Sequence, residues 1–298
     1  MKGAHRSAGA KVGCSSVTDP TLIAPPLACT VRNCGLPLAR NEQTWSCANG
    51  HSYDLARSGY LNLLQPQDRR SLTAGDAAAV VEARARLHAV GVGRALIRTL
   101  LDHVASLQLS DDTVMADLGS GSGDALGTCV AERGVAGIGI DLSVAAARHA
   151  ARRFPHVTWV VANADRRLPL IEASVSFLLS LHGRRNPGEC ARVLTPSGFL
   201  FVAVPAADDL IELREFIQGM PAERARVEAL LAEHEGLFTP IEHFSVREEH
   251  ALNRESLTDL LRSTYRGARA SVSGRVASLS AMDVTVASDC VLFQRRRS

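Results

Sequence analysis

The 298-residue sequence predicts an α/β fold in two parts, a Rossmann-like domain built on a parallel sheet and a small cysteine-rich module ahead of it. Two observations lead to this prediction. From Val114 onward, short apolar segments alternate with helical ones, which is the pattern of βαβ units. Before them, three cysteines crowd between residues 29 and 47, in a stretch without helical periodicity.

The bulk composition sets limits on the class of protein. Apolar residues make up 46% of the chain, which is enough to bury a core. The 33 basic residues nearly cancel the 31 acidic ones, so nucleic-acid binding would need local patches of charge. Every apolar run is cut by a charged residue or glycine, so we expect no membrane span and a cytoplasmic protein. Seven cysteines, three of them clustered, favour a reduced compartment with one metal site over a disulfide framework.

Composition and periodicity also divide the chain. Residues 1–26, rich in Gly, Ala, Ser and Pro, predict a flexible tail. Residues 27–66 predict a compact module of loops and hairpins, and residues 67–110 predict linking helices, with a break near Gly91 and Gly93. Residues 111–298 then form the sheet domain.

Apolar runs and amphipathic stretches define the elements of the sheet domain. The predicted strands are Val114–Asp117, Gly137–Asp141, Val157–Ala162, Val175–Leu181, Phe199–Val204 and Val284–Phe293. The predicted helices are Ala125–Arg133, Val144–Phe154, Pro187–Val193 and Asp208–Gln218. A pair of segments, Arg269–Leu279 and Val284–Arg295, predicts an antiparallel hairpin at one edge of the sheet.

The clustered cysteines form a ligand pattern with a histidine. Cys29, Cys34, Cys47 and His51 follow the spacing C-x4-C-x12-C-x3-H. Thiolates and an imidazole suit tetrahedral zinc, and a module this small needs a metal to fold. The alternative is a set of ordinary buried thiols with a surface histidine, because four residues between the first two cysteines is wider than the usual two. The sequence predicts a zinc-binding module.

A glycine-rich turn follows the first strand of the sheet domain. Asp117 ends the strand, and Gly119, Gly121, Ser122 and Gly123 follow before a helix, where the backbone can approach a ligand closely. The dinucleotide fingerprint would need glycine at position 124, where this chain has aspartate. The turn resembles the first motif of class I S-adenosylmethionine-dependent methyltransferases.

Two further aspartates follow the next strands. Asp141 ends the second strand, where a carboxylate can accept hydrogen bonds from both hydroxyls of a ribose. Asp165 follows the third strand, and the resemblance implies that it lies against the adenine edge of the cofactor. The alternative for Asp165 is a turn cap.

The module carries a second resemblance. From Cys47 to Leu64 the chain reads C-A-N-G-H-S-Y-D-L-A-R-S-G-Y-L-N-L-L, which closely resembles the ribosomal RNA guanine-N1-methyltransferases, including the branch that confers macrolide resistance. The resemblance runs over nearly the whole chain from about residue 27. It implies a class I methyltransferase fold, S-adenosylmethionine and Zn²⁺ as cofactors, a large-subunit ribosomal RNA hairpin as partner, and a homodimer. Tyr53 and Tyr60 either stack on RNA bases or pack against the module.

The chain departs from this family at two places beside the cofactor. His182-Gly183-Arg184 stands where relatives carry an aromatic-Ala-Pro stretch, and Asp209 stands where relatives place a histidine that contacts the cofactor. We therefore expect Asp209 to contact the cofactor, and the departures leave open a changed substrate or lost activity. None of His182, Asp165 and Asp209 is a convincing proton acceptor.

The predicted activity is methylation of a guanine at N1 in large-subunit ribosomal RNA. Because N1 is hidden in a Watson–Crick pair, the base must be unpaired or flipped out. The basic runs Arg69-Arg70, Arg184-Arg185 and Arg295-Arg296-Arg297 either bind phosphates or form solvated faces. Two alternatives stay open: a methyltransferase acting on a small metabolite, and a noncatalytic RNA-binding factor of ribosome assembly.

Overall fold

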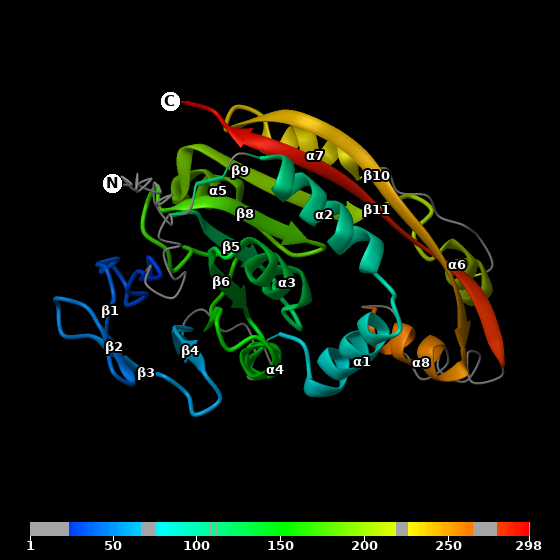
Figure 1. The fold of residues 1–298 in the computed structure, drawn as a ribbon, viewed down its shortest axis with the longest axis horizontal. Coiled ribbons are helices and arrows are strands. Elements are labelled where there is room, and N and C mark those ends of the chain that lie inside the picture. The colour runs from blue at the N-terminus through cyan, green and yellow to red at the C-terminus, as the bar shows by residue number, and fades with distance from the viewer. Residues whose placement is uncertain are drawn as a thin grey trace, which may run out of the picture.

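A computed structural model describes residues 24–66, 75–107, 109–110, 112–218, 226–264 and 279–297. Its centre is an eight-stranded sheet with the strand order β10-β11-β9-β8-β5-β6-β7-β4 (Figure 1). Both faces are covered. The helices α2 (Arg94–Ser106), α3 (Asp124–Arg133) and α4 (Val144–Arg153) bury one face, and α5 (Pro187–Val193), α7 (Val227–His234) and the N-terminal module bury the other. The predicted Rossmann-like α/β fold is confirmed.

The middle of the sheet is parallel, as the alternating pattern predicts. β5 (Val114–Leu118), β6 (Ala136–Asp141), β7 (Thr158–Val161), β8 (Val175–Leu181) and β9 (Leu194–Pro205) run in one direction. Because their carboxyl ends meet at one edge of the sheet, the loops that follow β5, β6, β7 and β8 converge there. That edge carries the candidate site.

Six of the eight helices in the described residues lie close to their predicted positions, while the last two along the chain were not predicted. The eight are α1 (Ala78–Ala89), α2 (Arg94–Ser106), α3 (Asp124–Arg133), α4 (Val144–Arg153), α5 (Pro187–Val193), α6 (Ile211–Gln218), α7 (Val227–His234) and α8 (Arg254–Ser263). The predicted break between the first two occurs at Gly91 and Gly93, whose φ angles are 103° and 81°, in the left-handed region that glycine tolerates. The side chains of Ser143 and Asn186 accept hydrogen bonds from first-turn amides and so begin α4 and α5.

The antiparallel partner of the last strand was predicted wrongly. β11 (Ala281–Arg295) pairs along its whole length with β10 (Phe238–Asn253) and on its other side with β9. The expected partner, residues 269–279, lies outside the described residues up to residue 278. β10 escaped prediction because most of its side chains are polar and at least partly exposed, so that it carries little of the apolar signal of a strand.

The N-terminal module is joined to the sheet by its last strand. β1 (Ala39–Asn41), β2 (Thr44–Ser46) and β3 (Ser52–Asp54) form a small antiparallel sheet of their own. β4 (Tyr60–Asn62) leaves it and pairs in parallel with β7. Leu27, Leu38 and Trp45 share a buried cluster with core residues of the large sheet. The module therefore shares one core with the sheet domain.

A third apolar cluster lies beyond the carboxyl edge of the sheet. It joins α1 and α8 to the far ends of β10 and β11. Nε and Nη2 of Arg86 on α1 donate to both carboxylate oxygens of Asp259 on α8, at 2.7 and 2.8 Å. This pair of helices stands beside the loops that follow the parallel strands (Figure 1). None of the helices in the described part of the chain is long and apolar enough to cross a membrane.

Candidate functional site

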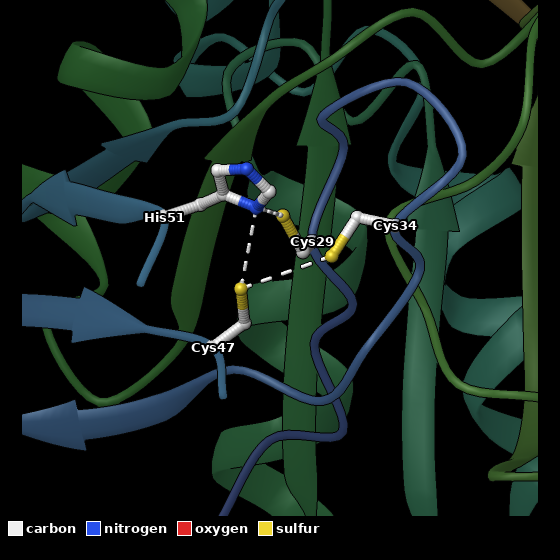
Figure 2. A group of neighbouring side chains, drawn as sticks. All are labelled: Cys29, Cys34, Cys47 and His51. Carbon is white, nitrogen blue, oxygen red and sulfur yellow. Dashed lines mark hydrogen bonds between the residues drawn. The ribbon is translucent and has the colours of Figure 1, made fainter. Parts of the chain in front are cut away.

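The four predicted zinc ligands come together in the module. The Sγ atoms of Cys29, Cys34 and Cys47 and a ring nitrogen of His51 all lie within 4.8 Å of one another. Figure 2 shows the four side chains pointing to a common centre. Cys29 and Cys34 come from the knuckle loop before β1, and Cys47 and His51 come from the loop between β2 and β3.

The distances fit a tetrahedral metal. Zn–S bonds of about 2.3 Å and Zn–N bonds of about 2.0 Å give tetrahedral edges of roughly 3.5 to 3.8 Å. Sγ of Cys34 lies 3.8 Å from Sγ of Cys47, and Nδ1 of His51 lies 3.4 Å from Sγ of both Cys29 and Cys47. The donor set of three sulfurs and one nitrogen is that of a structural zinc site, and His51 would bind through Nδ1.

The surroundings shift the pKa values of two of the thiols in opposite directions. Burial opposes ionisation of Cys47, but hydrogen bonds from the backbone of His51 and Asn49 outweigh it and lower the pKa of the thiol to about 7. Burial raises the pKa of Cys29. The hydroxyl of Tyr53 lies 3.2 Å from Sγ of Cys29 and accepts a bond from the Thr30 amide. Of the two roles expected for Tyr53, packing against the module is the one that these contacts favour.

The glycine turn lies at the carboxyl end of β5. Gly119, Gly121 and Gly123 have φ angles of 77°, 54° and 83°, so the turn uses the left-handed conformation three times. The Gly119 amide donates to the Ile140 carbonyl at 2.8 Å, which ties the turn to the neighbouring strand β6. The turn therefore has the conformation in which the sequence predicts that backbone can come close to a ligand.

Asp117 is a buried acid at the start of this turn. Its side chain is 3% exposed, and its Oδ1 atom has no hydrogen-bond partner in the described part of the chain. Burial, and then the charge of Asp141, raises the pKa of Asp117 to about 7. Oγ of Ser120, in the same turn, is also buried and without a partner among the described residues. Two unpaired buried polar atoms in one turn fit a site that binds a polar ligand.

Asp141 ends β6 beside the turn. Oδ2 accepts a hydrogen bond from the Gly121 amide at 2.8 Å, and Oδ1 accepts one from the Ser143 amide at 2.7 Å. Burial raises the pKa of Asp141, and these two bonds oppose the rise. A carboxylate has about four acceptor positions, so roughly two are left, which is the number that the two hydroxyls of a ribose need.

Ser122 lies within the turn, but its side chain points away from it. Oγ donates to Oδ2 of Asp124 at 2.6 Å, and Asp124 forms an ion pair with Arg153 at 2.6 Å. These bonds fix the start of α3 against α4. Only the backbone of Ser122 is therefore left for the predicted contact with the cofactor.

Asp165 lies in the turn after β7 and pairs with an arginine. Its Oδ2 atom lies 3.3 Å from Nη1 of Arg184, in the loop after β8. The cap of this turn is Asn163, whose Oδ1 accepts a hydrogen bond from the Asp165 amide at 3.0 Å. The alternative role of Asp165 as a turn cap is therefore taken by Asn163.

The segment that departs from the family lies directly on the glycine turn. A Cβ built on Gly183 would lie 2.4 Å from the Leu118 carbonyl oxygen, so only glycine fits there. His182 has a φ angle of 55°, and its Nε2 atom lies 2.9 Å from Oγ of Ser288 on β11. Burial, with Arg226 and Arg84 nearby, lowers the pKa of His182 to about 4. His182 is therefore neutral at pH 7 and hydrogen-bonded through Nε2, although the residue as a whole is exposed.

Asp209 is bound to β11. Its Oδ1 atom accepts a hydrogen bond from the Ala287 amide at 3.0 Å, and burial raises its pKa to about 6 despite that bond. No hydrogen bond or ion pair joins Asp209 to the glycine turn within the part of the chain that the structure describes. Its expected contact with the cofactor stays a prediction.

Three residues beside Asp141 were missed as site residues. A Cβ on Gly75 would lie 2.6 Å from the backbone of Ser143, and Oγ of Ser143 donates to the Asp76 carbonyl at 2.6 Å. Arg84 on α1 forms an ion pair with Asp76. The family resemblance from about residue 27 onward includes Gly75, Asp76 and Arg84, but a resemblance in sequence does not reveal that they lie beside the loop that follows Asp141.

The predicted basic runs separate into different environments. The guanidinium of Arg185 is buried and pairs with Glu233 at 3.2 Å, whereas the side chain of Arg184 is 78% exposed. Nη1 of Arg295 donates to the Leu194 carbonyl. Arg69-Arg70 lie outside the described residues. Among the arginines of these runs that the structure describes, Arg184 alone is an exposed cation beside the cofactor turn.

Comparison with known proteins matches this geometry. A zinc-ribbon family model described as "RlmA, N-terminal" matches residues 28–72. The 23S rRNA (guanine(748)-N(1))-methyltransferase of Streptomyces fradiae is 35% identical over 204 residues, covering 67% of this chain and 71% of the relative. A protein of Micromonospora griseorubida named "Putative 23S rRNA (guanine-N(1)-)-methyltransferase" is 33% identical over 287 residues, covering 86% of this chain and 92% of the relative.

Among solved structures, geranyl diphosphate methyltransferase in complex with SAM is 18% identical, covering 75% of this chain and 92% of that chain, with a TM-score of 0.45. The Micromonospora relative covers 86% of this chain, and the zinc-ribbon model matches the module at residues 28–72. The predicted class I methyltransferase fold with an N-terminal zinc module is confirmed. The chain belongs to the 23S rRNA (guanine-N1)-methyltransferase family.

Proposed function

We propose that this protein transfers a methyl group from S-adenosylmethionine to N1 of a guanine in large-subunit ribosomal RNA. One observation carries the proposal. The glycine turn after β5 and the acid that ends β6 are joined by the hydrogen bond from the Gly121 amide to Asp141, beside the unpaired Oδ1 of Asp117. Family membership supplies the substrate class, because the curated relatives are named as methyltransferases of 23S rRNA.

The residues divide the work of binding. Asp141 has the free acceptor positions for a ribose, and the exposed Gly119 and the half-buried Gly121 leave room for the amino-acid part of the cofactor. Asp165 is the expected contact at the adenine edge. The bound cofactor supplies a methyl group on a sulfonium, which is already activated. The protein therefore needs mainly to place the guanine in line and to exclude water.

Methylation at N1 releases the proton of N1, and the site limits what can accept it. His182 is unsuited, because its Nε2 atom is hydrogen-bonded to Ser288 and its pKa is lowered to about 4. Asp209 has its pKa raised to about 6, but its Oδ1 atom is held by the Ala287 amide, and no hydrogen bond or ion pair joins it to the glycine turn within the described residues. Its expected role therefore stays the contact with the cofactor, and no residue is assigned as the proton acceptor.

The zinc module, the compartment and the oligomeric state belong to the same proposal. The zinc module supports binding of RNA beside the sheet domain, and we propose a hairpin of large-subunit ribosomal RNA as its target. We propose that the enzyme acts in the cytoplasm, where ribosomal RNA is modified, and as a homodimer. Resistance to macrolide-type antibiotics follows only if the modified guanine lies where such a drug binds.

The deciding experiment is expression of the protein in a bacterial host that lacks its own enzyme of this family. Primer extension on 23S rRNA should gain one stop at a guanine, since a methyl at N1 blocks pairing. The Asp141→Ala variant should leave no stop. A protein that binds S-adenosylmethionine by calorimetry but adds no stop would fit the small-metabolite alternative. One that binds rRNA and no cofactor would be a noncatalytic factor. Growth on a macrolide series tests resistance separately.

A further inference from the structure

The turn after β7 exposes two adjacent arginines between the zinc module and the cofactor turn. Arg166 and Arg167 directly follow Asp165, and both side chains are exposed. Within the described residues, neither guanidinium forms an ion pair or a hydrogen bond with a carboxylate. Two exposed and unpaired cations next to an expected cofactor contact are free to bind a substrate.

Arg167 reaches the zinc knuckle itself. A Cβ built on Gly35, the residue after the zinc ligand Cys34, would lie 2.7 Å from Nη2 of Arg167. The guanidinium therefore lies directly against the knuckle backbone. The knuckle loop also exposes Arg32, so the positive charge continues onto the module.

On its other side the turn reaches the cofactor. Asp165 holds the exposed Arg184 at 3.3 Å, and Gly183, the residue before Arg184, packs against Leu118 and Gly119. The turn at residues 165–167 thus spans the gap, since Arg167 lies against the zinc knuckle and Asp165 pairs with Arg184, whose neighbour Gly183 lies on the glycine turn. The exposed Arg166 stands between these two contacts in the chain. An RNA strand held by the knuckle could follow this path to the cofactor.

The turn that carries the two arginines is rigid. Asn163 accepts hydrogen bonds from the Asp165 amide at its side chain and from the Arg166 amide at its carbonyl, at 3.0 and 3.1 Å. The Leu168 amide donates to Oε2 of Glu189 at 2.8 Å. Glu189 is the nearby acid that could neutralise Arg167, but its carboxylate is already held by Arg192. The backbone that carries the two arginines is therefore fixed, so both cations start from a defined place, and less of the turn has to be ordered when a ligand binds.

We infer that Arg166, Arg167 and Arg184 bind backbone phosphates of the RNA strand that leads from the zinc knuckle to the target guanine. The inference rests on the proposed function and adds the surface on which the substrate lies. Arginine suits this role, because its planar fork matches the oxygens of a phosphate. It also gives the zinc module a part in catalysis, since the knuckle would guide the strand to the site of transfer.

The test compares two double variants. Arg166→Ala with Arg167→Ala removes two cations from the proposed path. Arg98→Ala with Arg133→Ala removes two exposed cations from α2 and from the end of α3, outside the proposed path. Both proteins are titrated with protein-free 23S rRNA from the host that lacks the enzyme, at several salt concentrations. Each lost phosphate contact should lower the slope of log K against log salt by about 0.7 to 0.9.

We expect the path variant to lose roughly 1.5 from the slope and about tenfold in affinity at moderate salt, and the control variant to keep both values. Arg166→Lys with Arg167→Lys should restore the slope, because it keeps the charge. Zinc content and S-adenosylmethionine binding, measured on each variant, show that the fold is intact. A path variant with the wild-type slope overturns the inference, while methylation by the wild-type enzyme would leave the proposed function standing. If the wild-type protein binds no rRNA, both the inference and the proposed function are overturned.

Discussion

The amide of Gly121 donates a 2.8 Å hydrogen bond to Oδ2 of Asp141, so the glycine turn after β5 is held by the acid that ends β6. The same carboxylate accepts the Ser143 amide at 2.7 Å through Oδ1. Asp141 therefore shapes the turn, and in the proposed function it also keeps acceptor positions for the ribose. This double use makes Asp141 the most sensitive single position of the site.

Asp141→Ala should abolish measurable binding of S-adenosylmethionine in calorimetry. The change removes the ribose acceptor and leaves the Gly121 and Ser143 amides without a partner, each at a cost of about 1 to 3 kcal/mol. Asp102→Asn, on the exposed side of α2, is the matched control and should bind as the wild type does. Unchanged affinity in Asp141→Ala would show that the cofactor binds elsewhere.

Gly183→Ala should weaken cofactor binding by an order of magnitude or more. The new methyl group would lie 2.4 Å from the Leu118 carbonyl, so the backbone that supports Gly119 must move. Gly188→Ala on α5 is the control, because its Cβ would come no closer than 3.4 Å to Asn186. Isothermal titration with S-adenosylmethionine measures the affinity of each variant. Equal affinities would mean that the loop after β8 shifts to accept the new methyl group without disturbing the glycine turn.

Asp117 should make the free energy of unfolding depend on pH between about 4 and 7. Its folded pKa is raised from 3.8 to about 7, so the native state holds a proton that the unfolded state loses first. Stability from this group is present below pH 4 and is lost as the pH rises, by about 1.4 kcal/mol per pH unit across that window.

Asp117→Asn removes this titration. Urea unfolding of both proteins at pH 5 and pH 7 should show the wild type losing stability relative to the variant as the pH rises. The comparison is made without cofactor, because a ligand would add its own dependence on pH. A constant difference between the two proteins across the window would mean that Asp117 ionises normally.

Removal of zinc should destabilise more than the module. Because β4 pairs with β7 and the module shares a core cluster with the sheet, chelation should lower the midpoint of thermal unfolding and the hydrogen-exchange protection of Val160 and Val161. It should also weaken RNA binding while sparing S-adenosylmethionine binding, since Asp117 and Asp141 lie on inner strands.

Cys47→Ser is the genetic counterpart of chelation, and Cys190→Ala is its control. Cys190 is buried on α5 and is no part of the ligand set, so its variant should keep one zinc per chain in a metal assay. Loss of zinc from both variants, or from neither, would contradict the ligand assignment. RNA binding that survives chelation unchanged would mean that the module has no part in binding the substrate.

Local spacing along the chain was enough to identify the zinc ligands and the glycine turn. Cys29, Cys34, Cys47 and His51 could be identified because tight knuckles bring residues a few positions apart to one metal. The parallel strands and the turn at Gly119 could be identified because a buried strand and a left-handed turn need particular residues.

Contacts between residues far apart in the chain could not be predicted from the sequence, and only the tertiary structure shows them. His182 turns to Ser288, Asp209 to Ala287 and Arg167 to Gly35, and no spacing rule connects these pairs. β10 is a strand because β11 offers it a full-length partner, although its own side chains are mostly polar. The physical reason is that hydrogen bonding and burial are shared between distant segments, so one segment alone does not contain the energy that selects its conformation.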